Sequence, residues 1–124
     1  LVGIFLIVWI TCFNENSLTV CRNYVVQYIL DLGLAWAVAE VIDRLDGNFV
    51  HLAMQKFSSN VVEKCLKLGG DESRAKIIQE LTSSTRLAQL LQDPFANYVV
   101  QSALTVSKVK YLIIVQCLHF IAFS

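Results

Sequence analysis

The sequence predicts an all-α fold made of stacked helical repeats, because three of its segments match one another without gaps. The segments begin at Asn23, Ser59 and Asn97, so successive copies lie 36 and 38 residues apart. In each copy, apolar residues occupy the third, fourth, seventh, eighth and tenth positions, which is the stripe of an amphipathic helix. A repeat of this length indicates an α-solenoid, whose units bury their apolar faces only by stacking on one another.

Each unit is expected to contain a short helix, a central helix and a third helix. The matching register continues beyond the central helix, where Leu45 pairs with Leu81, and also precedes it, where Phe57 pairs with Phe95. The predicted units cover about residues 22–46, 47–84 and 85–108. Three units are about the minimum for a stable solenoid.

Turn residues punctuate the units at the expected places. Gly33 and the pair Gly69–Gly70 follow central helices, where a left-handed residue commonly ends a helix. Asp71 is positioned to cap the next helix, and the Asp-Pro step at Asp93 ends a short helix.

The two ends of the chain differ from its body. Residues 1–13 and 111–123 each contain 11 apolar residues of 13 and no charge, so all twenty charged residues lie between them. We expect 1–21 to be an atypical apolar segment with a partial first repeat, and 109–124 an atypical apolar tail. Such runs are shorter than a membrane span. Three interpretations remain open: buried or disordered pieces of the domain, a membrane or export segment, or sequence foreign to the domain. Because the chain opens with Leu, we expect it to be truncated.

Composition excludes several classes of function. Ten basic and ten acidic residues give a net charge of zero, which disfavours non-specific binding to DNA or RNA. The four cysteines and two histidines show no ligand spacing, so neither a metal nor another cofactor is expected. Free thiols indicate a reducing compartment, for which we predict the cytoplasm. Catalytic motifs are absent from the sequence, so an enzyme is not expected.

The first, second and fifth positions of each central helix are polar and lie off the apolar stripe. The first and fifth are one turn apart and can reach the same ligand, with the second beside them. The three triplets are Asn23/Tyr24/Gln27, Ser59/Asn60/Glu63 and Asn97/Tyr98/Gln101. Helix capping by Asn or Ser is the alternative, but it leaves the second-position Tyr and the Gln residues without a role.

Bases of single-stranded RNA fit this pattern. Tyr24, Asn60 and Tyr98 would stack on base faces, while the other two members of each triplet would hydrogen-bond base edges, one base per repeat. Asn with Gln supplies the donors and acceptors that uracil needs, and the Glu63 carboxylate, assisted by the Ser59 hydroxyl, suits the two donors of guanine.

Residues 22–108 resemble repeats six to eight of the Pumilio-type (PUF) RNA-binding family. The resemblance rests on the motifs Asn-Tyr-x-x-Gln, Ser-Asn-x-x-Glu and Asn-Tyr-x-x-Gln, in this order. It implies a right-handed α-solenoid of three-helix repeats, here a partial crescent, that binds RNA antiparallel on its concave face. The implied element is 5′-UGU-3′ in the 3′ untranslated regions of mRNAs.

The implied partner is therefore single-stranded mRNA, and the implied role is post-transcriptional repression or decay. Translational repressors or a deadenylase complex are the expected protein partners; DNA and membranes are not expected partners. Two alternatives to RNA binding remain open. One is a helical-repeat scaffold for protein partners that has lost RNA binding through truncation, and the other is a membrane-tethered fragment.

Overall fold

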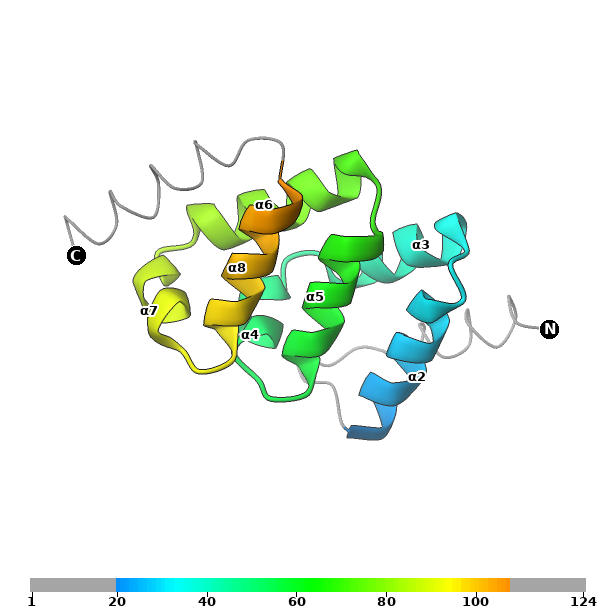
Figure 1. The fold of residues 1–124 in the computed structure, drawn as a ribbon, viewed down its shortest axis with the longest axis horizontal. Helices are drawn as coiled ribbons and strands as arrows, with labels where there is room; N and C mark the ends of the chain where they lie inside the picture. The colour runs from blue at the N-terminus through cyan, green and yellow to red at the C-terminus, as the bar shows by residue number, and fades with distance from the viewer. Residues whose placement is uncertain (1–19, 108–124) are drawn as a thin grey trace.

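The structure, a computed structural model, describes the backbone of residues 20–107 and the side chains of residues 24–107. Every secondary-structure element in this range is an α-helix, which confirms the predicted all-α solenoid class (Figure 1). In chain order the helices are α2 (Val20–Asp31), α3 (Ala35–Leu45), α4 (Phe49–Ala53), α5 (Ser58–Leu68), α6 (Asp71–Ser83), α7 (Leu87–Gln92) and α8 (Ala96–Val106). None of these helices is long and apolar enough to cross a membrane.

The helices occur in the order that the repeat predicts. The second unit is complete, with α4 as its short helix, α5 as its central helix and α6 as its third helix. The first unit contributes a central and a third helix, α2 and α3, and the last unit a short and a central helix, α7 and α8. Of the atypical segment predicted for residues 1–21, residues 1–19 lie outside the described residues, and so does the whole of the predicted tail 109–124.

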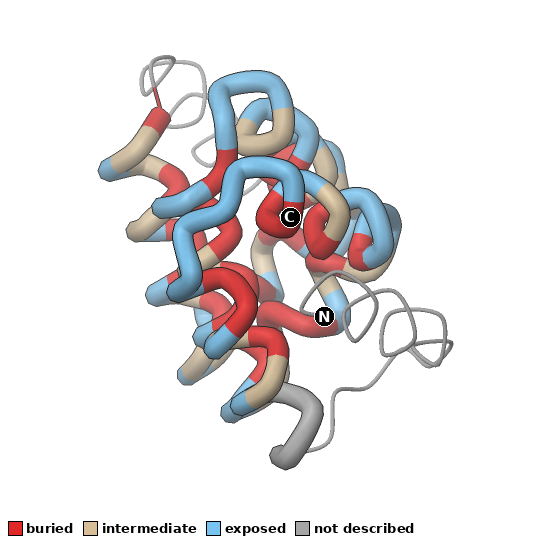
Figure 2. The backbone as a smooth tube through the Cα atoms, turned by 90° about the vertical axis from the view of Figure 1, so that its right-hand side faces the viewer, coloured by how far each residue is buried: buried red, intermediate tan, exposed pale blue. Residues whose placement is uncertain are grey.

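The three central helices form one layer of the fold. Helix α5 packs against α2 on one side and against α8 on the other, and the three helices lie side by side in Figure 1. The short and third helices, α3, α4, α6 and α7, form the layer behind them. In Figure 2 the buried backbone gathers where the layers meet, and the exposed backbone lies on the outside.

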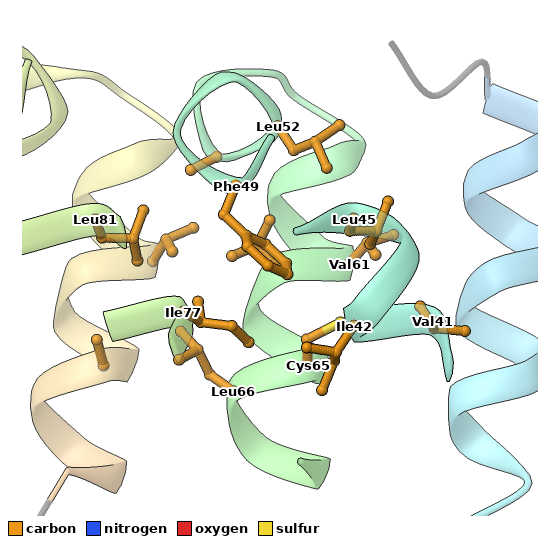
Figure 3. Close-up of a cluster of buried hydrophobic side chains, with 14 of the residues drawn as sticks. Val41, Ile42, Leu45, Phe49, Leu52, Val61, Cys65, Leu66, Ile77 and Leu81 are labelled. Atoms are coloured by element: carbon orange, nitrogen blue, oxygen red, sulfur yellow. The ribbon is translucent and has the colours of Figure 1, made fainter. Parts of the chain in front are cut away.

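Phe49 lies at the centre of the core between the layers. Its side chain is fully buried among residues of four helices, α3, α4, α5 and α6 (Figure 3). The other labelled residues of this cluster are Val41, Ile42, Leu45, Leu52, Val61, Cys65, Leu66, Ile77 and Leu81. Because the helices of two units meet there, the core of one unit is completed by the next, as expected for a solenoid.

The glycines between helices only partly match the prediction. Gly33 has a φ of 71°, the left-handed conformation expected after α2. Gly69 and Gly70 have φ values of −69° and −67°, so the predicted left-handed end of α5 is wrong. Gly69 is needed for space instead, since an added Cβ would lie 2.7 Å from the Cys65 carbonyl oxygen and 3.0 Å from Ile42 Cδ1.

The junction between α5 and α6 is held by Arg74 rather than by a cap from Asp71. The N-cap of α6 is Gly70, and Asp71 is the first helical residue, where its charge favours the positive end of the helix dipole. Arg74 Nε donates a hydrogen bond of 2.8 Å to the carbonyl oxygen of Leu66, and Nη2 donates one of 3.2 Å to that of Gly69. Arg74 thereby satisfies carbonyl groups at the end of α5 that lack helical partners.

Glu80 joins the third helix of the second unit to the start of the same unit. Its Oε1 accepts a hydrogen bond of 2.7 Å from the Gly47 N–H, and Oε2 accepts one of 3.1 Å from the Val50 N–H. The carboxylate thus pairs backbone donors at the start of α4, where the N–H groups of a helix have no acceptor within the helix.

Replacing Phe49 by Ala is expected to destabilise the fold by about 3–5 kcal/mol, because it removes a fully buried ring from a core shared by four helices. The free energy of unfolding is measurable by urea denaturation followed by far-UV circular dichroism. The matched control is Phe57→Ala, since Phe57 is 38% exposed and its truncation should cost less than half as much. Equal losses would contradict the central place of Phe49.

Cys65 is expected to resist alkylation in the folded chain, because burial raises the pKa of its thiol to about 12. In the unfolded chain the thiol ionises near its ordinary pKa of about 8.5. Raising the pH from there toward 12 therefore favours the unfolded state, which loses the proton that the folded state keeps. Peptide mass spectrometry after iodoacetamide treatment at about pH 8.5 should show Cys65 unmodified in buffer and modified in guanidinium chloride. Rapid labelling in buffer would disprove the prediction.

Candidate nucleic-acid interface

The predicted triplets lie on three neighbouring helices of one layer. Each triplet occupies the beginning of a central helix, on α2, α5 and α8 respectively, and α5 contacts both of the others. The structure therefore brings the three triplets into one series across adjacent helices (Figure 1). The side chain of Asn23 lies outside the described residues, although its backbone belongs to α2.

The residues predicted to stack are all exposed. Tyr24 is 66% exposed and Tyr98 is 59% exposed, while Asn60 occupies the same position on α5 and is also exposed. Exposed aromatic rings at matching positions of two helices provide flat apolar surfaces to which planar groups can bind. These side chains therefore have the accessibility that base stacking needs.

The third triplet forms a linked pair of amides. Gln101 Nε2 donates a hydrogen bond of 3.2 Å to Asn97 Oδ1, and Asn97 Nδ2 donates one of 2.6 Å to the carbonyl oxygen of Asp93. These bonds fix which end of the Asn97 amide faces Gln101. Gln101 is exposed, and its carbonyl oxygen can accept a hydrogen bond from a ligand.

The second triplet is less exposed. Ser59 is only 5% exposed, and its hydroxyl donates a hydrogen bond of 3.1 Å to the carbonyl oxygen of Lys56. Glu63 is half-buried, and its Oε1 accepts a hydrogen bond of 2.8 Å from the hydroxyl of Ser102 on α8. In the first triplet, Gln27 is half-buried like Glu63.

Capping does not explain these triplets. Helices α5 and α8 begin at Ser58 and Ala96, before the triplet residues, and the side chain of neither N-cap residue makes a capping hydrogen bond. Asn97 donates to a preceding carbonyl group, whereas a capping Asn would accept from an N–H. The first turn of α8 is capped by Asp93, whose Oδ2 accepts hydrogen bonds from Phe95 and Ala96.

The residue directly after the last member of each triplet was not assigned a role from the sequence. In two units its side chain bonds to the preceding unit: Ser102 donates to Glu63, and Lys64 forms an ion pair of 2.7 Å with Asp31 on α2. The Lys64–Asp31 pair is partly exposed, so its contribution to stability is below about 1 kcal/mol. The available signal in the sequence was Lys64 and Ser102, which directly follow the last triplet residue in the second and third units.

Metal-ligand geometry is absent from residues 20–107, where His, Cys, Asp and Glu side chains form no cluster of three or more. His51 is hydrogen-bonded to Gln55 over 2.8 Å.

Comparison with known proteins identifies the repeat. The family model described as "Pumilio-family RNA binding repeat" matches residues 48–82 and 86–114. The chain belongs to the Pumilio family. Helices α5 and α8 thus lie within the two matched repeats, and the resemblance to the family inferred from the triplets is confirmed.

Pumilio proteins from a plant and a fission yeast are similar to the chain. Pumilio homolog 12 of Arabidopsis thaliana is 56% identical over 86 residues, which cover 69% of the chain and 14% of that protein. Pumilio homolog 11 of the same species is 46% identical over 99 residues, or 77% of the chain and 17% of the homolog. A Pumilio domain-containing protein of Schizosaccharomyces pombe is 42% identical over 88 residues, or 71% of the chain and 13% of the yeast protein. The chain therefore spans only a small part of the length of these relatives.

Proposed function

We propose that this chain binds single-stranded RNA and recognises a 5′-UGU-3′ core. The observation that carries the proposal is the arrangement of the triplets on α2, α5 and α8, where they occupy equivalent positions at the beginnings of three adjacent helices. Such a series matches the one-base-per-repeat recognition that helical repeats use for single-stranded RNA. Membership of a family of RNA-binding repeats supports the same partner.

Each unit is assigned one base. With the RNA antiparallel to the chain, Asn97 and Gln101 bind the first uracil through their amides, and Tyr98 stacks beside it. Glu63 accepts hydrogen bonds from the two donors of guanine, with Ser59 next to it. Asn23 and Gln27 bind the second uracil, beside Tyr24. The two base-edge groups of each triplet thus lie one turn apart on one face of the helix, and the stacking group lies beside them.

The cellular role proposed is binding to 3′ untranslated regions of mRNA in the cytoplasm, leading to repression or decay. The chain would act by recruitment, through translational repressors or a deadenylase complex, rather than by catalysis. The free thiol of Cys65 in the core supports a reducing compartment.

The affinity of the chain alone should be modest. Stacking is worth about 1–3 kcal/mol per base, and three bases must also offset the cost of ordering the RNA and the loss of its freedom. We therefore expect a Kd of about 1 μM or weaker.

The chain is expected to bind a UGU-containing oligonucleotide more tightly than one in which G is replaced by C. Hydrogen bonds to a charged group contribute about 1.5–3 kcal/mol, so the ratio of the two Kd values should be about 10 to 100. Fluorescence anisotropy with the complete 124-residue chain measures both values. Equal affinities would refute base recognition by Glu63. A folded chain that bound neither RNA would favour the protein-scaffold alternative.

The double variant Ser59→Asn/Glu63→Gln is expected to change the preference from UGU to UUU, because it gives the second unit the amide pair of the third. The reciprocal variant Asn97→Ser/Gln101→Glu is the matched control, and it should change the first base to G while leaving the middle base unchanged. The Kd values of UGU, UUU and GGU oligonucleotides, measured for each variant by anisotropy, test both shifts. Loss of all binding without a new preference would contradict the base assignment.

A further inference from the structure

We propose that Ser102 is a positioning residue for Glu63, so that selectivity for guanine depends on a contact between two repeats. The proposal rests on the function proposed above and extends it to a residue outside the triplets. Ser102 lies on α8, in the unit assigned to the first uracil, whereas Glu63 lies on α5.

The geometry of the pair supports this role. The Ser102 hydroxyl is 2.8 Å from Glu63 Oε1, and both side chains are half-buried. An ionised carboxylate only accepts hydrogen bonds, so the hydroxyl is the donor. A carboxylate has about four acceptor positions, of which this bond uses one. The remaining positions suffice for the two donors that guanine presents.

Preorganisation is the benefit of this contact. Glu has three rotatable side-chain bonds, and a ligand that binds its carboxylate must restrict them. A hydrogen bond formed before binding restricts them in the free protein, which lowers the cost of binding by about two- to tenfold in Kd. Because Glu63 contacts only the middle base, the benefit should be confined to RNA with guanine at that place.

Other polar side chains near the triplets bond to different partners. Thr105 on α8 donates a hydrogen bond of 3.0 Å to the carbonyl oxygen of Gln101, within its own helix. The residue of the second unit that corresponds to Ser102 is Lys64, and it pairs with both oxygens of Asp31 rather than with Gln27. Among residues 24–107, Glu63, which is proposed to bind guanine, is therefore the base-edge residue that accepts a side-chain hydrogen bond from the next unit.

The test is Ser102→Ala in the complete chain, with Kd measured by anisotropy for oligonucleotides that carry UGU or UUU and are otherwise identical. We expect the Kd for UGU to rise about two- to tenfold and that for UUU to stay unchanged, so the ratio falls by the same factor. Ser102→Thr, which keeps a hydroxyl, should restore the ratio. The matched control Thr105→Ala, which removes a hydroxyl from the same helix, should leave the ratio as it was.

Two results would overturn the role of Ser102. One is an unchanged ratio in Ser102→Ala, and the other is an equal loss of affinity for both RNAs, which would indicate a structural contribution alone. Ser102→Cys, of nearly the same volume and with a weaker donor, covers the case in which Ser102→Ala does not fold; it should lower the ratio in the same direction. An unaltered ratio in Ser102→Cys would equally overturn the role.

The outcome for the unmodified chain separates the two proposals. If that chain fails to prefer UGU over UUU, guanine recognition itself is refuted and the role of Ser102 falls with it. If the unmodified chain prefers UGU and Ser102→Ala prefers it equally, RNA recognition stands and only the role of Ser102 is refuted.

Discussion

Burial of α5 between its two neighbours is the interaction on which the rest of the molecule depends. Val61, Cys65 and Leu66 have no exposed surface, and they fill the space between the layer of central helices and the helices behind it. The opposite side of the same helix carries Asn60 and Glu63. The core residues and the residues proposed to bind bases thus lie on two faces of one helix, and a change in the way α5 packs would displace both sets together.

The repeat in the sequence was sufficient to predict the unit order, the helix order and the layer that carries the triplets. It was sufficient because apolar periodicity determines which face of each helix must be buried. In addition, Gly33 marks a turn with a positive φ, which glycine adopts without strain. The contacts of Gly69, Arg74 and Ser102 were not predictable in this way. They depend on how far one helix is displaced along its neighbour, and the spacing of residues along the chain does not contain that distance.

The charges of the central layer suit recognition of RNA bases better than binding of the phosphate backbone. Lys64, which projects from that layer, is paired with Asp31, and the chain as a whole has no net charge. Attraction to the phosphate backbone is therefore weak, and salt should affect any RNA affinity only slightly. Under the proposed function, discrimination between bases would depend on amide and carboxylate groups held in place by neighbours, as Asp93 holds Asn97.

The bonds of Glu80 and Arg74 also bear on how such an array can grow. Both residues bond within the second unit, and Glu80 ties its last helix to its first turn at Gly47. The first unit has Arg44 and Val38 at the corresponding positions, and these lack, respectively, the carboxylate and the guanidinium group that make these bonds in the second unit. A gene duplication that copied residues 47–84 as a block would carry every one of these internal bonds with it. Lengthening the array would then require only one new pair of packing surfaces between neighbouring units, and under the proposed one-base-per-repeat recognition each added block would bind one further nucleotide.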